Sequence, residues 1–167
     1  MKRALFIGRF QPFHLGHLSV VKEAMEKCDQ VIIGIGSAEQ SYLPDNPFTA
    51  GERFELIDSA LREEGVSAEK YCILPVRNIN NYALWPNHVD ALVPEYDEVY
   101  TGSKIVKQLF ERQEKHKVVD VKMLEGICGA EVRNRILQDQ NWEEMVPKKV
   151  AELLKKWNAS KRLKDIS

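Results

Sequence analysis

Two histidines, His14 and His17, lie three positions apart on either side of Gly16. An apolar run at residues 4–7 predicts a buried strand before them, and apolar residues three and four positions apart after them predict a helix that begins near Gly16. The first amides of a helix have no partner inside it and carry its positive dipole end, so this turn is suited to bind a phosphate. A helix cap or a metal site would explain a random histidine pair, but the neighbouring Arg9 favours phosphate binding.

A second turn before a helix, at residues 126–135, contains Gly129 and Arg133. Cys128 and Ala130 flank Gly129, and a thiol is a poor hydrogen-bond donor while a methyl group is none. Anion binding here would therefore depend on backbone amides and on the Arg133 guanidinium. Cys128 is also a candidate nucleophile, but the spacing assigns it no base, which leaves covalent catalysis as the less favoured hypothesis.

Strand and helix signals alternate along the chain. Apolar runs at residues 4–7, 30–36, 71–76, 99–101 and 118–124 predict five strands. Helices are expected after Gly16, after a capping box formed by Thr49 and Glu52, around 88–92 and 105–110, and after Gly129. The pattern predicts an α/β fold: a single Rossmann-like domain over residues 1–167, doubly wound, with a parallel sheet, helices on both faces and ligands at the strands' carboxyl ends.

The end of the chain, residues 141–167, is expected to be helical. Asn141 and Glu144 resemble a helix cap, and a final helix should begin at Pro147 and finish in a solvated basic tail. Arg53, in the helix after the capping box, is expected to be a surface or ion-pairing residue.

Composition limits the classes of partner. The net charge of −1 gives no basic field for nucleic acid, and no apolar run is long enough to span a membrane. The first three residues lead directly into a strand, so no signal peptide is expected and the cytoplasm is the default location. Three widely spaced cysteines fit neither a disulfide framework nor a zinc site and are interpreted as reduced thiols.

The segment from Gly8 to His17 resembles a known signature. His14-x-Gly16-His17 after a first strand is similar to the motif of the nucleotidylyltransferase superfamily, and the longer segment resembles its nicotinamide mononucleotide (NMN) adenylyltransferases, especially the archaeal type. The segments 46–53 and 126–135 are similar to further parts of that family. The resemblance implies adenylyl transfer from ATP to NMN, giving NAD and pyrophosphate by direct attack, and it implies a homo-oligomer, with the archaeal hexamer as precedent.

The resemblance also implies roles for particular residues. Those expected to contact ATP are Gly8, Arg9, His14, Gly16, His17, Thr101, Gly102, Ser103, Gly129 and Arg133, and four of them, Arg9, His14, His17 and Arg133, are expected to be catalytic. Ser37, Asn78 and Trp85 are the expected NMN contacts, with the Trp85 indole stacked on the nicotinamide ring. Mg²⁺ would be carried mainly by ATP phosphates, so no metal ligands are assigned.

Several residues depart from the family pattern. Asn78 replaces an acid, Tyr82 replaces an asparagine, and Asp45 replaces a basic residue that some relatives carry. Core packing is the alternative role for Trp85, and an ordinary turn residue is the alternative for Ser37. Two other functions stay open at this stage: nucleotidyl transfer to phosphopantetheine or FMN, and a binding protein that senses nucleotides without turnover.

Overall fold

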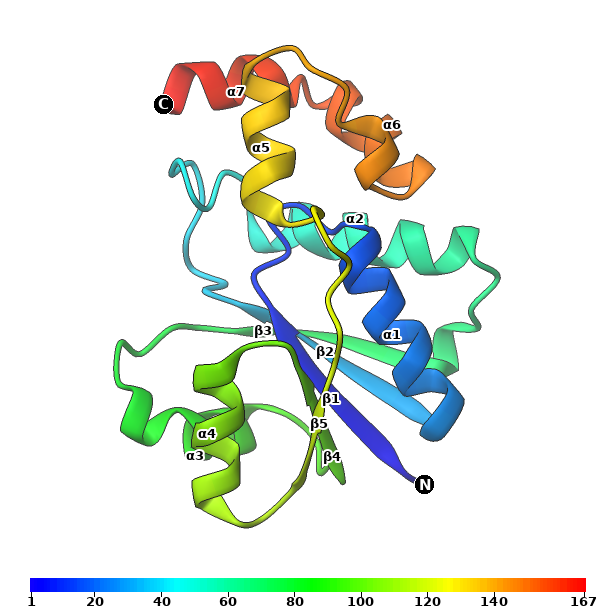
Figure 1. Ribbon diagram of the computed structural model, residues 1–167, viewed down its shortest axis with the longest axis vertical. Coiled ribbons are helices and arrows are strands. Elements are labelled where there is room, and N and C mark those ends of the chain that lie inside the picture. Colours follow the sequence, from blue (N-terminus) through cyan, green and yellow to red (C-terminus); the bar gives the residue numbers. More distant parts are fainter.

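The centre of the molecule is a five-stranded parallel sheet, seen in a computed structural model that describes residues 1–167 (Figure 1). The strands are β1 (Arg3–Gly8), β2 (Gln30–Gly36), β3 (Tyr71–Val76), β4 (Glu98–Thr101) and β5 (Lys117–Asp120), in the order β3-β2-β1-β4-β5. The chain winds outward from β1 in both directions, so its topological switch point lies between β1 and β4. The predicted α/β class and the parallel sheet are confirmed.

Helices cover both faces of this sheet (Figure 1). They are α1 (Leu15–Lys27), α2 (Ala50–Glu63), α3 (Trp85–Leu92), α4 (Lys104–Gln113), α5 (Gly129–Leu137), α6 (Lys148–Lys156) and α7 (Ala159–Ile166), with short 3₁₀ turns at Ala68–Lys70, Tyr82–Leu84 and Glu143–Met145. Each face of the sheet has its own hydrophobic core, and alternate residues of β1 point into one or the other. Phe6 packs in the core formed with α1 and α2, whereas Leu5 packs in the core formed with α3 and α4.

The last strand is shorter than the apolar pattern predicts. β5 pairs with β4 in register from Lys117 to Asp120, and β4 itself ends at Thr101, so the chain beyond has no strand to pair with. Met123 and Leu124 are exposed instead of continuing the sheet.

The C-terminal segment also differs from expectation. The cap-like sequence at Asn141 begins no α-helix, since only the 3₁₀ turn Glu143–Met145 forms there. The predicted final helix is broken at Asn158, whose φ of 52° is left-handed, and two amphipathic helices result.

Arg162 on α7 does not belong to a solvated tail. Its guanidinium donates to both carboxylate oxygens of Glu52 at 2.7 Å and lies 4.8 Å from the centre of the Tyr42 ring. Glu52 at the same time accepts from the Thr49 amide in the predicted capping box of α2. The last helix is therefore fastened to the start of α2.

Candidate active site

His14 and His17 form a reciprocal cap at the start of α1. His14 Nδ1 accepts from the His17 amide and His17 Nδ1 accepts from the His14 amide, both at 3.3 Å. Because an imidazole nitrogen that accepts carries no proton, the proton of each neutral ring is on Nε2. The capping interpretation is thus correct, and it leaves both Nε2–H groups free to donate to a ligand.

The surroundings keep these rings neutral. Burial lowers the pKa of His14 to about 4, and burial together with the neighbouring His14 lowers that of His17. The His17 ring also lies against Phe10 and Phe13, with ring centres 4.8 and 5.6 Å apart. At neutral pH the pair offers oriented donors at a positive helix end rather than full charges.

Gly16 is required by the position of the His14 ring. A β-carbon at residue 16 would lie 2.9 Å from the His14 Cε1 atom, closer than carbon atoms approach in proteins. Any side chain here would displace the ring that caps the helix.

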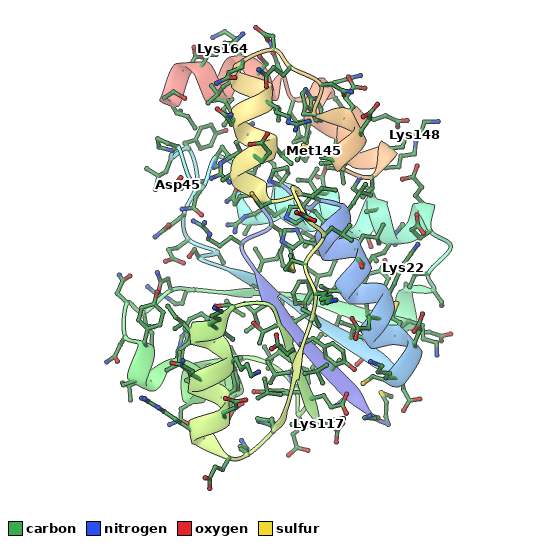
Figure 2. All side chains as sticks on the ribbon, in the orientation of Figure 1. Lys22, Asp45, Lys117, Met145, Lys148 and Lys164 are labelled. Atoms are coloured by element: carbon green, nitrogen blue, oxygen red, sulfur yellow. The ribbon has the colours of Figure 1, made fainter.

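Arg133 on α5 reaches the same region from the other signature. It is 7% exposed, its Nη1 donates to the Gln11 carbonyl at 2.9 Å, and its Nη2 lies 3.4 Å from the Asp45 carboxylate. Figure 2 shows Asp45 on the loop beside α5. Burial and the nearby Arg9 charge lower the pKa of Arg133.

The start of α5 has no side-chain cap. Cys128 is the N-cap residue, is exposed and makes no side-chain hydrogen bond to the helix. A β-carbon at Gly129 would lie 3.2 Å from both Arg133 Nη1 and the Gln11 carbonyl oxygen, so a side chain here would crowd both groups. The amides of this turn and Arg133 are the donors that the turn can offer to a ligand.

A cavity of about 600 Å³ opens beside these groups at the carboxyl ends of β1, β2 and β3. Its lining includes Gly8, Arg9, Ser37, Asn78, Trp85 and Ser103. The volume is in the range of small-molecule sites. Arg9 is exposed and brings a cation to its wall.

Trp85 is the first residue of α3 and not part of the preceding loop. His88, one turn later, has its ring centre 5.6 Å from that of Trp85, and its Nε2 lies 2.9 Å from the Arg77 carbonyl oxygen. A carbonyl can only accept, so His88 donates and ties α3 to the loop after β3. The half-buried indole lies at the cavity wall and also packs against the core cluster that contains Leu5 and Val89, so the two roles weighed for Trp85 are compatible.

The Asn78 side chain, an expected NMN contact, forms hydrogen bonds within its own loop. Its main-chain amide donates to the Glu39 carboxylate at 3.1 Å, and its side chain exchanges hydrogen bonds with Asn80 at 3.0 and 2.9 Å. The side chain therefore shapes the loop that lines the cavity.

The turn after β4 is closed by its own side chains. Thr101 Oγ1 accepts from the Ser103 amide at 3.0 Å, and Ser103 Oγ accepts from the Val106 amide at 3.4 Å to cap α4. A β-carbon at Gly102 would lie 2.8 Å from Met123 Cγ. Met123 thus lies over the turn expected to contact ATP.

Arg53 contradicts its expected surface position. It is 0% exposed, and its donors are all directed at main-chain carbonyls. The sequence pattern missed this because a guanidinium is rarely buried without a carboxylate partner.

No group of three or more His, Cys, Asp or Glu side chains is placed to hold a metal ion. No helix is long and apolar enough to cross a membrane. A second cavity of about 430 Å³, lined by Arg3, Asp90 and His116 among others, lies at the amino ends of the strands, away from both signatures.

Comparison with known proteins assigns the family. Residues 5–160 match the family described as cytidylyltransferase-like. The nicotinamide-nucleotide adenylyltransferase of Archaeoglobus fulgidus is 46% identical over 99% of this chain and 97% of its own length. That of Pyrococcus furiosus is 42% identical over 98% and 88%. The chain belongs to the nicotinamide-nucleotide adenylyltransferase family within this cytidylyltransferase-like group.

A solved structure supports the fold of this family member. A bifunctional NMN adenylyltransferase/ADP ribose pyrophosphatase from Francisella tularensis superimposes with a TM-score of 0.83 at 22% identity, over 99% of this chain. The present chain spans about half, 52%, of that protein's length.

Apart from Thr101 and Gly102, which lie in the turn after β4, the predicted site residues fall into two groups. Gly8, Arg9, Ser37, Asn78, Trp85 and Ser103 line the cavity, whereas His14, Gly16, His17, Gly129 and Arg133 surround the two helix starts. Sequence reasoning missed Gln11, Arg53 and Met123. Gln11 lies inside the first signature and Arg53 inside the family-like segment 46–53, whereas nothing in the sequence pointed to Met123.

Proposed function

We propose that this protein transfers the adenylyl group of ATP to NMN, forming NAD and pyrophosphate. The observation that carries the proposal is that two helix starts rich in hydrogen-bond donors lie together, that of α1 with His14 and His17 and that of α5 with Arg133. They lie beside a cavity whose wall holds an indole. The relatives with this name, aligned over nearly their full lengths, support it.

The chemistry asks the protein mainly to position two anions. An oxygen of the NMN 5′-phosphate attacks the α-phosphorus of ATP, the bond to the β-phosphate breaks, and pyrophosphate leaves with the electron pair. No bond to the enzyme forms. Holding both phosphates in line converts the encounter of two repelling anions into a step within one complex.

The named side chains would stabilise the charge that spreads during this step. The Nε2–H groups of His14 and His17 are donors fixed by the cap, and they need no reorganisation when charge develops. Arg133 would hold the triphosphate with the amides near Gly129, and the exposed Arg9 would neutralise phosphate charge from the cavity side.

Mg²⁺ would enter this site bound to the phosphates of the substrate. No cluster of acidic side chains is available, so phosphate oxygens and water would supply the ligands. Its chemistry when bound would be neutralisation of the triphosphate charge.

The nicotinamide ring would stack on Trp85. A flat cation suits the face of an indole, and His88 fixes the position of that face. The neutral amides of the loop at Asn78 to Asn81 line the same cavity.

The deciding experiment is an assay with ATP and one of four acceptors: NMN, nicotinate mononucleotide, FMN or phosphopantetheine. Formation of NAD and pyrophosphate from NMN, well above turnover of FMN and phosphopantetheine, is the expected result. Binding of NMN without pyrophosphate release would overturn the proposal in favour of a nucleotide sensor. Faster turnover of FMN or phosphopantetheine would assign another acceptor.

A further inference from the structure

Arg53 is buried behind the cavity and is not a member of either signature. Its Nη1 donates to the carbonyl oxygens of Arg9 at 2.9 Å and Gly36 at 2.8 Å. Its remaining donors reach the carbonyls of Ser37, Ala38, Gln40 and Thr49. The side chain thus joins the ends of β1 and β2, whose residues Arg9 and Ser37 line the cavity.

The burial of this charge without a carboxylate is costly. Burial is the main cause that lowers the pKa of Arg53 to about 10, still far above neutrality, so the guanidinium stays charged. A buried charge is tolerated only where its hydrogen bonds are satisfied, and here carbonyl oxygens satisfy them.

Both carbonyls bound by Nη1 precede a residue with strained backbone. Phe10 follows the Arg9 carbonyl with φ 53°, and Ser37 follows the Gly36 carbonyl with φ 46°. Left-handed backbone is unfavourable for residues with a side chain and persists only where the surroundings impose it. Arg53 is the group that contacts both peptides.

The orientation of these peptides directs two donors away from Arg53, and residues of both peptides, among them Arg9 and Ser37, line the cavity. In a trans peptide the N–H points opposite to the C=O, so the amides of Phe10 and Ser37 point away from Arg53. Neither amide donates to any acceptor within the protein, although the neighbouring Ala38 amide donates to Val76. A hydrogen bond to each carbonyl also polarises its peptide and strengthens the N–H as a donor.

We infer that Arg53 is a positioning residue which, through the Arg9–Phe10 and Gly36–Ser37 peptides, presents the amides of Phe10 and Ser37 to a phosphate group of the substrates. The inference deepens the proposed function and rests on it for the identity of those substrates. Arg53 itself touches no substrate, because it is fully buried. Its charge reaches the phosphate through the two peptides.

The test compares ligands that differ only in phosphate. Binding of NMN and nicotinamide riboside, and of ATP and adenosine, is measured by calorimetry on the wild type, on Arg53→Lys and on the control Arg62→Lys. Arg62 lies on the same helix, is exposed and pairs with Asp58. Lysine keeps the charge, but its single nitrogen cannot donate to the carbonyls that Nη1 binds and also to those that Nη2 and Nε bind.

For Arg53→Lys we expect binding of at least one phosphorylated ligand to weaken about tenfold, the loss of one strong hydrogen bond, with its phosphate-free partner changed less than twofold. Whether NMN or ATP is affected identifies the phosphate. Equal weakening of both members of each pair, or no weakening, would overturn the inference. Arg62→Lys should behave as the wild type.

A second measurement uses the wild type alone, so it remains possible if Arg53→Lys fails to fold. In the wild type, the amide resonances of Phe10 and Ser37 should shift downfield on addition of NMN or ATP and stay in place with nicotinamide riboside or adenosine. Equal shifts with nicotinamide riboside or adenosine would contradict the inference. Turnover of ATP and NMN by the wild type tests the proposed function separately, so the two can fail independently.

Discussion

The imidazole rings of His14 and His17 stack with their centres 3.6 Å apart and their planes 21° from parallel, while each ring accepts the main-chain amide of the other residue. The same four atoms therefore cap α1 and fix both tautomers. Capping and catalysis are not alternatives at this position, because they use opposite nitrogens of each ring.

Substitution of His17 should affect the rate more than the fold. In His17→Ala, kcat should fall on the order of 10²-fold, as for loss of one preorganised donor. The loss of half the cap should cost about 1 kcal/mol of unfolding free energy. Steady-state kinetics and urea unfolding measure the two effects. An unchanged kcat would remove His17 from the mechanism.

The histidine pair should also make the fold sensitive to acid. His14 has a folded pKa of about 4 against 6.5 when unfolded, so between these values the unfolded state binds the proton and the folded state does not. Stability is full above pH 6.5 and should decline as pH falls to about 4, by about 3 kcal/mol for His14. Urea unfolding at several pH values measures the slope. His14→Asn, which retains a capping oxygen, should flatten it, and an unaltered slope would assign the titration elsewhere.

Arg133 should not be replaceable by lysine. One guanidinium reaches both the Gln11 carbonyl and the ligand side of the turn, and a single ammonium group cannot reproduce that geometry. Arg133→Lys should lower kcat on the order of 10²-fold. Arg135→Lys, on the same helix and paired with Glu131, is the matched control and should be near wild type. Near-normal turnover of Arg133→Lys would show that another residue holds the triphosphate.

Asp45 should compete with ATP for Arg133. Its carboxylate is 78% exposed and lies 3.4 Å from Arg133 Nη2, so a phosphate must replace it. Asp45→Asn should lower the KM for ATP by up to about fivefold, since exposed ion pairs contribute at most about 1 kcal/mol. The gain should shrink at high salt. A higher KM would instead show that Asp45 assists nucleotide binding.

Cys128 should be dispensable as a nucleophile. Direct transfer predicts that Cys128→Ser stays active or improves, because a hydroxyl is a better cap and donor at the start of α5. Mass spectrometry of the protein with ATP alone should show no AMP adduct. An adduct in the wild type together with an inactive Cys128→Ser would refute direct transfer.

The sequence predicted the parts of the site that local patterns encode. The strand before His14, the helix after it and the capping box at Thr49 each need only a few neighbouring residues, and all three are confirmed. Local patterns could not predict the positions of Arg53 and Asp45. Arg53 is buried by contacts with main-chain carbonyls up to 44 residues away, and Asp45 meets Arg133 across 88 residues.

The errors at the chain end have a similar cause. Lys117–Asp120 ends where its partner strand ends, and the break at Asn158 turns α7 back toward α2 so that Arg162 reaches Glu52. Neither event is encoded by hydrophobic periodicity, because both depend on which element lies alongside.

The Arg162–Glu52 pair links the last helix, α7, to the loop at residues 41–49. Glu52 holds the cap of α2, and Arg162 also donates to the Pro47 carbonyl, so local unfolding of α7 would release residues 41–49 together with it. Amides of that loop and of α7 should exchange with deuterium as one cooperative unit. The loop that carries Asp45 is thus kept ordered by residues more than a hundred positions later in the chain.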